Sequence, residues 1–297
     1  MCSPYVTRPL TVEIVVVVSG ADPVAEAVSS RWGTLPAAEG HVDGTPLRRL
    51  SETTWVVRRP GWHIHDEEVD RRLPATVRAA RPTLVFPSIH RSERMVASLT
   101  VHPLGNPGAS NDMGGRPRSL VPTDPERMVT TLRRLEEQCR PLNLPATYEA
   151  THHGPLVELP AFFVEVGSGE RTDPSPEAIR ILADVIPKIE ASSGDRVALG
   201  VGGGHYVPHF TELALERRWA FGHLLSRHAL EEIDRPTAEE AYALSPRAEG
   251  VVYSRARDTD LPALQGVGPR LRDQDAPPRE RSVGGPPTGV ARSASGT

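Results

Sequence analysis

The run TVEIVVVVS at residues 11–19 is an almost continuous series of β-branched residues. Such a run is typical of a strand that is buried on both faces of a sheet. In the GADP that follows, Asp22 suits a helix N-cap and Pro23 the first helical turn, so we expect a helix as far as Ser30. A strand that leads directly into a helix predicts an α/β protein.

The rest of the chain continues this alternation of strands and helices. Short apolar runs predict strands at residues 53–58, 83–86, 98–101, 146–151, 162–166 and 196–201, and periodic patterns predict helices at 124–139, 174–190 and 238–244. We therefore expect a layered α/β/α domain with a mostly parallel or mixed central sheet. In such a domain, ligands bind at the carboxyl ends of the strands.

The composition sets the limits of this domain. Residues 255–297 have few large apolar side chains and many Gly, Pro, Ser and Arg residues, so we expect a catalytic domain at 1–254 and a disordered tail at 255–297. No apolar run has the length of a transmembrane helix, and the start MCSPYVTRPL lacks the apolar core of a signal peptide. We expect a cytoplasmic protein that makes no membrane contact. Cys2 and Cys139 are too few for a disulfide framework or a cysteine zinc site.

Positive charge is concentrated in one segment. Residues 71–140 hold twelve arginines and six acidic residues, a local charge of +6 in a chain whose net charge is −4. This segment is either a basic face for phosphate groups or a solvated arginine-rich surface. Charge alone does not separate the two.

Histidines recur where predicted strands meet Gly or Pro. They are His90 in PSIHRS, His102 in LTVHPLGN, His152 and His153 in THHGP, His205 in GGGHY, and His223 after Gly222. A single histidine at a strand end commonly bonds a nearby carbonyl and does nothing else. Five similar settings favour a metal site, because neutral imidazole is the commonest side-chain metal ligand. Glu165 lies inside the apolar run FFVEV, where a buried carboxylate needs a partner or a metal.

Several familiar catalytic motifs are missing from the sequence. There is no H-E-x-x-H helix of zinc proteases and no G-x-S-x-G nucleophile elbow. The glycines at 202–204 are not followed by the Lys-Ser/Thr of a P-loop, which disfavours an NTPase. Their backbone N–H groups can cradle a phosphate, or the run is simply a tight turn.

The motifs taken together resemble a known family. SIHRS at 88–92, LTVHPLGN at 99–106, EATHHGP at 149–155, FVEVGS at 163–168, GGGHY at 202–206 and GH at 222–223 occur in the order found in D-aminoacyl-tRNA deacylases of the archaeal and plant type. The resemblance implies a zinc-dependent esterase that removes a D-amino acid from tRNA. It also implies a fold akin to peptidyl-tRNA hydrolases and nucleoside phosphorylases.

The resemblance and the spacing give expected roles for named residues. We expect zinc to be held by His152, His153, His205 and His223, with Glu165 as a further ligand or a general base. His90 or His102 would carry a proton to the ribose oxygen that leaves. The expected substrate contacts are Arg91, Arg94, Asn106, Thr151 and Gly203.

Two other functions remain open on the sequence. A nucleoside phosphorylase-like glycosyl transferase would need phosphate and no metal, because fold alone does not fix function. A non-enzymatic RNA-binding module would use its histidines only structurally. Metal content and sensitivity to a chelator separate both from a zinc esterase.

Overall fold

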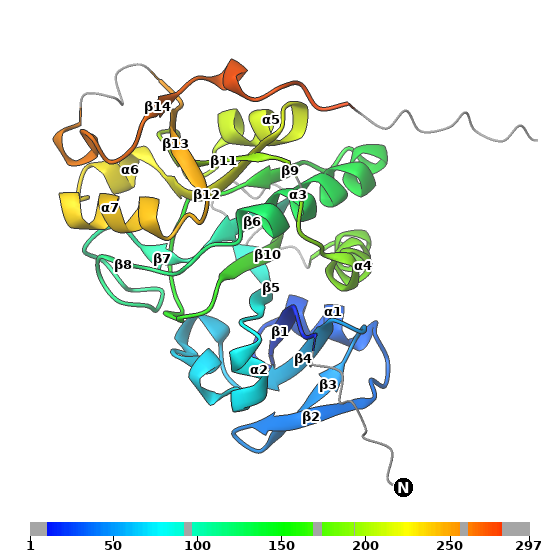
Figure 1. The fold of residues 1–297 in the computed structure, drawn as a ribbon. Coiled ribbons are helices and arrows are strands. Elements are labelled where there is room, and N and C mark those ends of the chain that lie inside the picture. The colour runs from blue at the N-terminus through cyan, green and yellow to red at the C-terminus, as the bar shows by residue number, and fades with distance from the viewer. Residues whose placement is uncertain (1–10, 92–96, 169–173, 193, 256–260, 281–297) are drawn as a thin grey trace, which may run out of the picture.

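The computed structural model describes residues 11–91, 97–168, 174–192, 194–255 and 261–280. Its centre is an eight-stranded mixed sheet with the order β2-β3-β4-β1-β5-β10-β6-β9 (Figure 1). The strands are β1 (Ile14–Ser19), β2 (Ala37–Val42), β3 (Thr45–Arg49), β4 (Thr54–Arg59), β5 (Thr83–Arg91), β6 (Leu99–Pro103), β9 (Ala146–Tyr148) and β10 (Ala161–Ser168). Strands β4, β1, β5 and β10 are parallel, and β6 runs antiparallel to β10. The expected α/β class with a mixed sheet is confirmed.

A second, parallel sheet lies at the other end of the molecule and was not predicted as a separate unit. It has the order β12-β11-β13-β14, with strands β11 (Arg196–Val201), β12 (Trp219–Leu225), β13 (Ala248–Tyr253) and β14 (Arg270–Leu271). Two short strands, β7 (Gly105–Asn106) and β8 (Ser119–Leu120), form a small ladder of their own. The carboxyl ends of β11 and β12 lead into loops that reach the first sheet.

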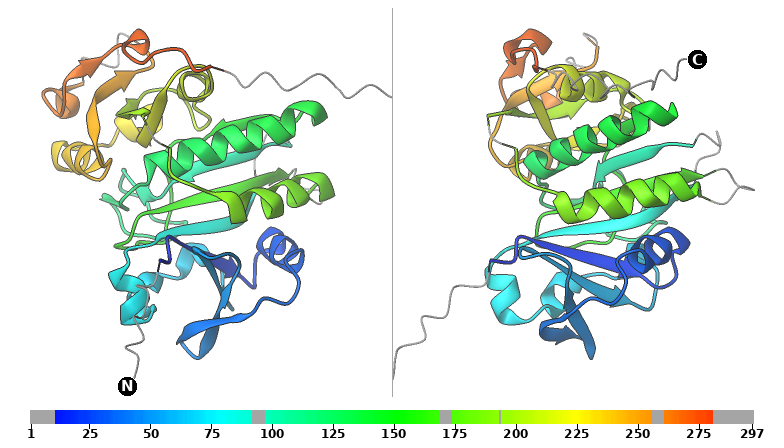
Figure 2. Two further views of the ribbon diagram at one scale, coloured as in Figure 1. Left: turned by 45° about the vertical axis from the view of Figure 1, so that its right-hand side comes forward. Right: turned by 90° about the vertical axis from the view of Figure 1, so that its right-hand side faces the viewer.

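Helices cover the sheets and join them. They are α1 (Pro23–Ser30), α2 (Ala75–Ala79), α3 (Pro125–Cys139), α4 (Pro176–Val185), α5 (Pro208–Glu216), α6 (Arg227–Leu230) and α7 (Arg235–Ala243). Helix α4 contacts both α1 and α3, and the three lie along one face of the large sheet (Figure 2). Helix α3 also contacts β12, so it lies between the two sheets. The predicted caps are present, because the side chains of Asp22 and Asp124 accept bonds from the first turns of α1 and α3.

The large sheet is buried on both faces, as the β-branched run at its centre predicts. Val16 and Val18 of β1 join the core beneath the helices, whereas Val15 and Val17 join a separate core on the other face. That second core lies under α2 and two 3-10 turns, His63–His65 and Val69–Arg72. The alternation follows from the period of two along a strand.

Strand ends differ from the prediction in a way that matters for the site. Strand β5 runs on to Arg91 and β6 to Pro103, so His90 and His102 lie within strands rather than after them. Strand β9 ends at Tyr148. The segment from Glu149 to His153 is therefore not a regular strand, and its side chains do not alternate as expected.

Residues 261–280 are ordered against the body, so the expectation of a disordered tail from 255 onward is wrong for them. Strand β14 pairs with β13, and the Trp219 indole donates to the Asp273 carbonyl at 2.9 Å. Ala276 is fully buried. A strand edge offers unpaired backbone groups, so a segment with few apolar residues can still dock there. The other residues of the expected tail, 256–260 and 281–297, lie outside the described part.

The arginines of the +6 segment are mostly paired. Among its described side chains, the ion pairs are Arg71 and Arg78 with Glu158, Arg72 with Asp66, Arg116 with Glu68, Arg118 with Asp234, Arg127 with Glu13, Arg133 with Asp195, Arg134 with Glu190 and Arg140 with Glu136. Acidic residues from elsewhere in the chain thus neutralise most of this charge. The structure therefore does not support an extended basic face built from the segment as a whole.

Within the described ranges, every helix is too short or too polar to cross a lipid bilayer.

Candidate active site

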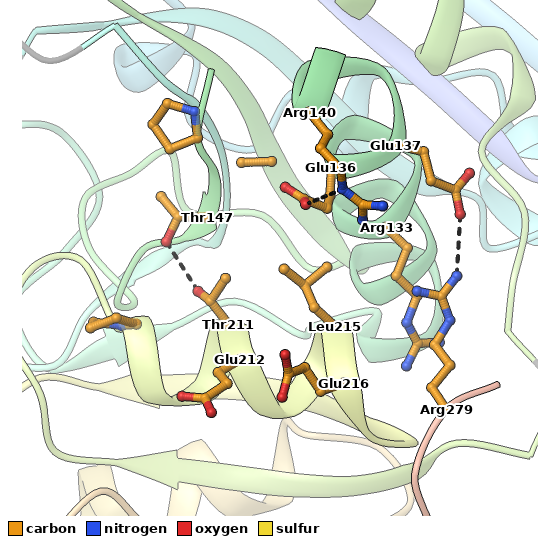
Figure 3. A pocket seen from close by; sticks show the side chains of 13 residues that line it. Arg133, Glu136, Glu137, Arg140, Thr147, Thr211, Glu212, Leu215, Glu216 and Arg279 are labelled. Carbon is orange, nitrogen blue, oxygen red and sulfur yellow. Dashed lines mark hydrogen bonds and ion pairs between the residues drawn. The ribbon is translucent and has the colours of Figure 1, made fainter. Parts of the chain in front are cut away.

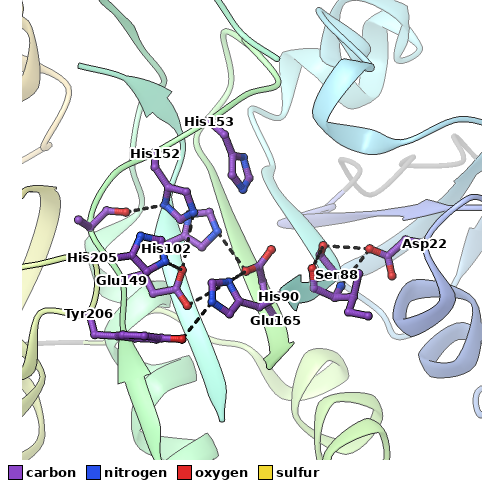
Figure 4. Close-up of polar contacts among 12 residues, drawn as sticks. Asp22, Ser88, His90, His102, Glu149, His152, His153, Glu165, His205 and Tyr206 are labelled. Carbon is purple, nitrogen blue, oxygen red and sulfur yellow. Dashed lines mark hydrogen bonds and ion pairs between the residues drawn. The ribbon is translucent and has the colours of Figure 1, made fainter. Parts of the chain in front are cut away.

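Three strands of the large sheet present polar side chains on one face. Glu165 on β10 pairs in register with Ser88 on β5 and Thr100 on β6. His90 pairs with Gly167, and His102 with Phe163, which are two residues from Glu165 on either side. Residues two apart on a strand share a face, so Glu165 and both histidines point the same way (Figure 4).

His90 lies between a carboxylate and a phenol. Its Nδ1 is 3.2 Å from Glu165 Oε2, and its Nε2 is 3.0 Å from the Tyr206 hydroxyl. Burial opposes a charge on this ring, but the hydrogen bond to Glu165 and the negative charge of Glu149 outweigh burial and raise the pKa of His90. His90 is therefore able to carry a proton near neutral pH.

Glu165 is a buried carboxylate surrounded by histidines. Burial would raise its pKa, but the nearby His102 and His90 hold that pKa well below its usual range. The same attraction acts on His102, where burial lowers the pKa and the charge of Glu165 more than offsets it, so that the pKa of His102 is raised. The His102 Nε2 atom is 3.6 Å from Glu165 Oε2, beyond hydrogen-bond reach.

The rings of His152 and His153 do lie together, as expected from the turn after them. Their centroids are 4.4 Å apart, and the His102 ring is 4.1 Å from that of His152. The backbone of His153 is left-handed, with φ of 47°, and the turn is tied to Gly105 by a 2.8 Å bond to the His153 carbonyl. The left-handed residue turns the second ring back toward the first.

These three histidines share one bonding pattern. The Nδ1 atoms of His102, His152 and His153 lie 3.1, 2.8 and 2.7 Å from the carbonyl oxygens of Pro103, Ala150 and Gly154, respectively. A carbonyl oxygen can only accept, so each Nδ1 carries a proton, and in the neutral form of each ring the Nε2 lone pair is free. Histidines that bind metals usually donate their other ring N–H in this way.

The electrostatics of the pair favour the neutral ring. Burial, and then the neighbouring His102, lower the pKa of His153 to about 4. The same causes hold the pKa of His152 well below its usual value. Both rings are thus available as neutral ligands at physiological pH.

Glu149 is a candidate site residue that the sequence reasoning did not select. It is fully buried, and neither of its carboxylate oxygens accepts a hydrogen bond in the described part of the chain. The nearest ring nitrogens are His205 Nε2 at 3.1 Å and His90 Nδ1 at 3.5 Å, and neither makes a hydrogen bond to Glu149. The signal was present in EATHHGP, but a regular strand was assumed there and Glu149 was given no role.

The cluster contains three sets of side chains whose ligand atoms lie within 4.8 Å of one another. They are His102, His152 and His153; His90, Glu149 and His205; and His102, Glu149 and Glu165. Imidazole nitrogens and carboxylate oxygens are the donors that zinc accepts. In the described chain, neither the two oxygens of Glu149 nor the Nε2 atom of His102 has a hydrogen-bond partner. Buried polar atoms without a partner are expected in a site that binds a cation.

The cluster opens into a cavity of about 1070 Å³. Residues of β5 and β10 line it together with the loop after β11 and residues of α5 and α6. Four lining residues that sequence reasoning missed are Trp62, His63, Met113 and Arg227. His63 is buried against Phe163, with ring centroids 5.0 Å apart, and burial lowers its pKa to about 4. None of these four lies within a motif that was recognised in the sequence.

A second cavity of about 420 Å³ lies between α3, α5 and Arg279 (Figure 3). Its polar contacts are internal, such as the 3.3 Å ion pair of Arg279 with Glu137 and the 3.0 Å contact between the hydroxyls of Thr147 and Thr211. No histidine or nucleophile lines it in the described structure. The larger cavity is the one that carries chemistry.

Comparison with known proteins identifies the family. Residues 78–262, more than half of the chain, match the D-aminoacyl-tRNA deacylase family. The chain belongs to this family. A deacylase is a hydrolase, so membership places the chain among hydrolytic enzymes.

Relatives support the assignment. The D-aminoacyl-tRNA deacylase of Thermoplasma acidophilum is 37% identical over 172 residues, which are 58% of this chain and 67% of that protein. That of Methanosphaerula palustris is 37% identical over 217 residues, 72% of this chain and 47% of that protein, so the chain spans about half the length of this relative. The crystal structure of AF0625, a conserved protein of unknown function, superposes with a TM-score of 0.76 at 26% identity, covering 89% of this chain and 96% of that one.

Two residues expected at the site of this family member lie elsewhere. His223 is fully buried on β12, and its Nδ1 is 3.0 Å from the Thr151 hydroxyl. Thr151 also accepts from the Leu224 N–H at 3.0 Å, so it ties the turn to the second sheet instead of facing the cavity. Burial lowers the pKa of His223 to about 3. The geometry gives no support to His223 as a zinc ligand or to Thr151 as a substrate contact, because neither lines the cavity or belongs to a metal-capable group among the described residues.

The other expected substrate contacts divide into two kinds. The Asn106 amide donates to the Gly114 carbonyl at 2.8 Å and so holds the loop that carries Met113. Gly203 has a left-handed backbone, and its carbonyl accepts from the Arg227 N–H at 2.9 Å. Both shape the rim and do not line the cavity. Arg94 and the side chain of Arg91 lie outside the described residues.

Proposed function

We propose that this chain hydrolyses the ester bond of D-aminoacyl-tRNA, which releases a D-amino acid and free tRNA. The observation that carries the proposal is the cluster of His102, His152 and His153, whose Nδ1 atoms lie at carbonyl oxygens and which each offer a ligand atom within 4.8 Å of the others. Family membership supplies the substrate class.

We further propose that these histidines hold a zinc ion. When bound, zinc acts as a Lewis acid and lowers the pKa of water. A proton and a metal compete for the same Nε2 lone pair, so binding should weaken in acid. His205 lies beside Glu149 and would support the site from the second sheet.

The protein's own side chains have distinct tasks in this proposal. Glu149 has two free carboxylate oxygens, so it is the residue suited to take the proton of the attacking water. His90 carries a proton and can give it to the ribose oxygen as the ester bond breaks, while Glu165 and Tyr206 fix its ring. One proton leaves the water and one reaches the leaving oxygen, so the hydrolysis is balanced.

Two observations favour hydrolysis over the other functions considered. A glycosyl transferase that uses phosphate would need cationic or N–H donors beside the reacting groups, whereas the histidine cluster there contains two buried carboxylates, Glu149 and Glu165. A purely RNA-binding module would have no use for the buried, unpartnered carboxylate of Glu149.

The test compares two histidines that received the same prediction. His152→Gln should leave a folded protein that has lost bound zinc and most hydrolysis of D-aminoacyl-tRNA. His223→Gln should keep both per folded molecule. Zinc is measured by metal analysis and hydrolysis with D- and L-aminoacyl-tRNA, before and after a chelator. Full zinc and full activity in His152→Gln would overturn the proposed site, and activity that ignores the chelator would overturn the metal.

A further inference from the structure

We propose that the rim of the cavity binds the 3′-terminal nucleotide of the tRNA, with the Trp62 ring stacked on its base and the Arg227 guanidinium on its phosphate. The inference rests on the proposed function and adds the part of the substrate that the rim recognises. It follows from what is exposed at the cavity mouth.

Trp62 is exposed where a tryptophan is normally covered. It is 39% exposed, and Met113, which lines the same cavity, is 55% exposed. The other large apolar side chain that is exposed in the described chain is Leu142, at 43%, which lines neither cavity. Two of the three thus border one opening, a pattern typical of a binding surface.

The segment that carries Trp62 is fixed from both sides. The Ser19 hydroxyl donates to the Gly61 carbonyl at 2.8 Å, and the Arg59 Nε donates to Asp66 at 2.8 Å across the 3-10 turn. A ring on a fixed segment loses little freedom when a ligand stacks on it. Aromatic rings bind bases of any identity through their π faces.

Arg227 supplies a charge that the rest of the protein does not use. It lines the cavity, is exposed, and forms no ion pair within the described chain, in contrast to the paired arginines of residues 71–140. Glu165 is the one carboxylate among the described lining residues, and it is buried and bonded to His90. The rim is therefore complementary to an anion.

The size of the cavity fits a nucleotide together with an amino acid. Pockets for drug-sized ligands occupy about 300–1,000 Å³, and this cavity has about 1070 Å³. The histidine cluster lies on strands of the large sheet, whereas Arg227 follows β12 of the second sheet. With the ester bond at the histidine cluster, the cavity has room for the terminal base beside Trp62 and for its phosphate beside Arg227.

The experiment measures binding by calorimetry, so it does not depend on hydrolysis. The probes are stable amides: 3′-(D-phenylalanyl)amino-3′-deoxyadenosine, its 5′-phosphate, and D-phenylalaninamide without a nucleoside. Trp62→Ala should weaken both nucleoside probes about tenfold, as expected from the loss of one stacked base. Trp62→Phe should restore most of that loss. Arg227→Gln should weaken the 5′-phosphate about fivefold and leave the unphosphorylated probe unchanged.

Matched controls separate the rim from the general surface. Leu142→Ala and Arg49→Gln change an exposed apolar side chain and an exposed arginine on β3, away from the cavity, and should change no dissociation constant. Unchanged binding in Trp62→Ala, or an equal loss for D-phenylalaninamide, would overturn the nucleotide subsite. If the wild-type protein binds the probes as described but does not hydrolyse D-aminoacyl-tRNA, the proposed function fails and the subsite stands.

Discussion

Two buried ionisable side chains in this protein, Arg133 and Glu149, have opposite hydrogen-bonding surroundings. Arg133 on α3 faces Asp195 with two parallel contacts of 2.7 and 3.1 Å, and it also donates to the carbonyls of Ala214 and Arg217. Glu149 is just as buried, yet neither of its oxygens accepts a hydrogen bond among the described residues. The first group is satisfied from every side, and the second is left open.

The difference separates a structural charge from a functional one. A buried polar group without a partner costs about 1–3 kcal/mol, more when it is charged. The fold removes that cost at Arg133, where the pair joins α3 to the second sheet. At Glu149 and at the Nε2 atom of His102 the cost remains. Such open groups are what a site needs when its partner is a substrate, a proton or a metal.

Breaking the satisfied pair should have the largest effect on stability. Arg133→Met removes the bidentate partner of the buried Asp195, which keeps only the Ser192 hydroxyl and the 3.7 Å contact with Arg218 Nε. We therefore expect a loss of about 3 kcal/mol in the free energy of unfolding. Activity per folded molecule should not change. Urea denaturation of this variant and of Arg133→Met with Asp195→Leu measures it, and the double variant should recover much of the loss. If Arg133→Met were as stable as the wild type, Arg133 would not be a structural charge and its contrast with Glu149 would fail.

Removing the carboxylate of Glu149 should reduce activity rather than stability. Glu149→Gln removes the proton acceptor and keeps the shape of the side chain, so we expect hydrolysis to fall about 1,000-fold. The free energy of unfolding should not fall and should rise by about 1 kcal/mol or more, because no hydrogen bond is lost and a buried, unpartnered charge is removed. Single-turnover hydrolysis and urea denaturation give the two values. A large loss of stability with normal activity would make Glu149 a structural residue like Asp195.

His223 is intermediate between Arg133 and Glu149, because its Nδ1 contacts Thr151 and its Nε2 has no partner in the described chain. Its contribution to stability should depend on pH. Its pKa is about 3 in the folded state and about 6.5 in the unfolded chain. Between these values the unfolded state binds more protons, so stability falls as the pH falls. From pH 7 to pH 4 this histidine should account for about 3 kcal/mol of the loss. Denaturation at both pH values should show a smaller loss in His223→Gln than in the wild type.

The smallest expected effect on stability concerns residues 261–280, which pack against the second sheet. A chain ending at Ser254 loses the carbonyls that accept from the Trp219 indole and the Arg218 N–H. We expect it to be less stable by about 2 kcal/mol. A chain ending at Glu280 keeps these contacts and should melt at the wild-type temperature. Equal melting temperatures for all three chains would show that residues 261–280 contribute nothing.

The sequence determined the elements whose information is local. The β-branched run at 11–19, the caps Asp22 and Asp124, and the periodic helix at 125–139 were predicted because their signals lie within a few residues of each other. The family was also recognisable, since its motifs are short and ordered. Among the histidines, five of the six expected ones meet at one cluster: His90, His102, His152, His153 and His205.

The tertiary structure decided which buried polar groups are satisfied. The strand predicted at 146–151 would put Glu149 and Thr151, which are two residues apart, on one face, but β9 ends at Tyr148 and the two side chains part. Thr151 then contacts His223 and accepts from the Leu224 N–H, whereas Glu149 joins the cluster beside His90 and His205. Hydrogen-bond partners come from strands that are distant in sequence. Their absence around Glu149 is therefore a property of the packed sheets that no stretch of sequence encodes alone.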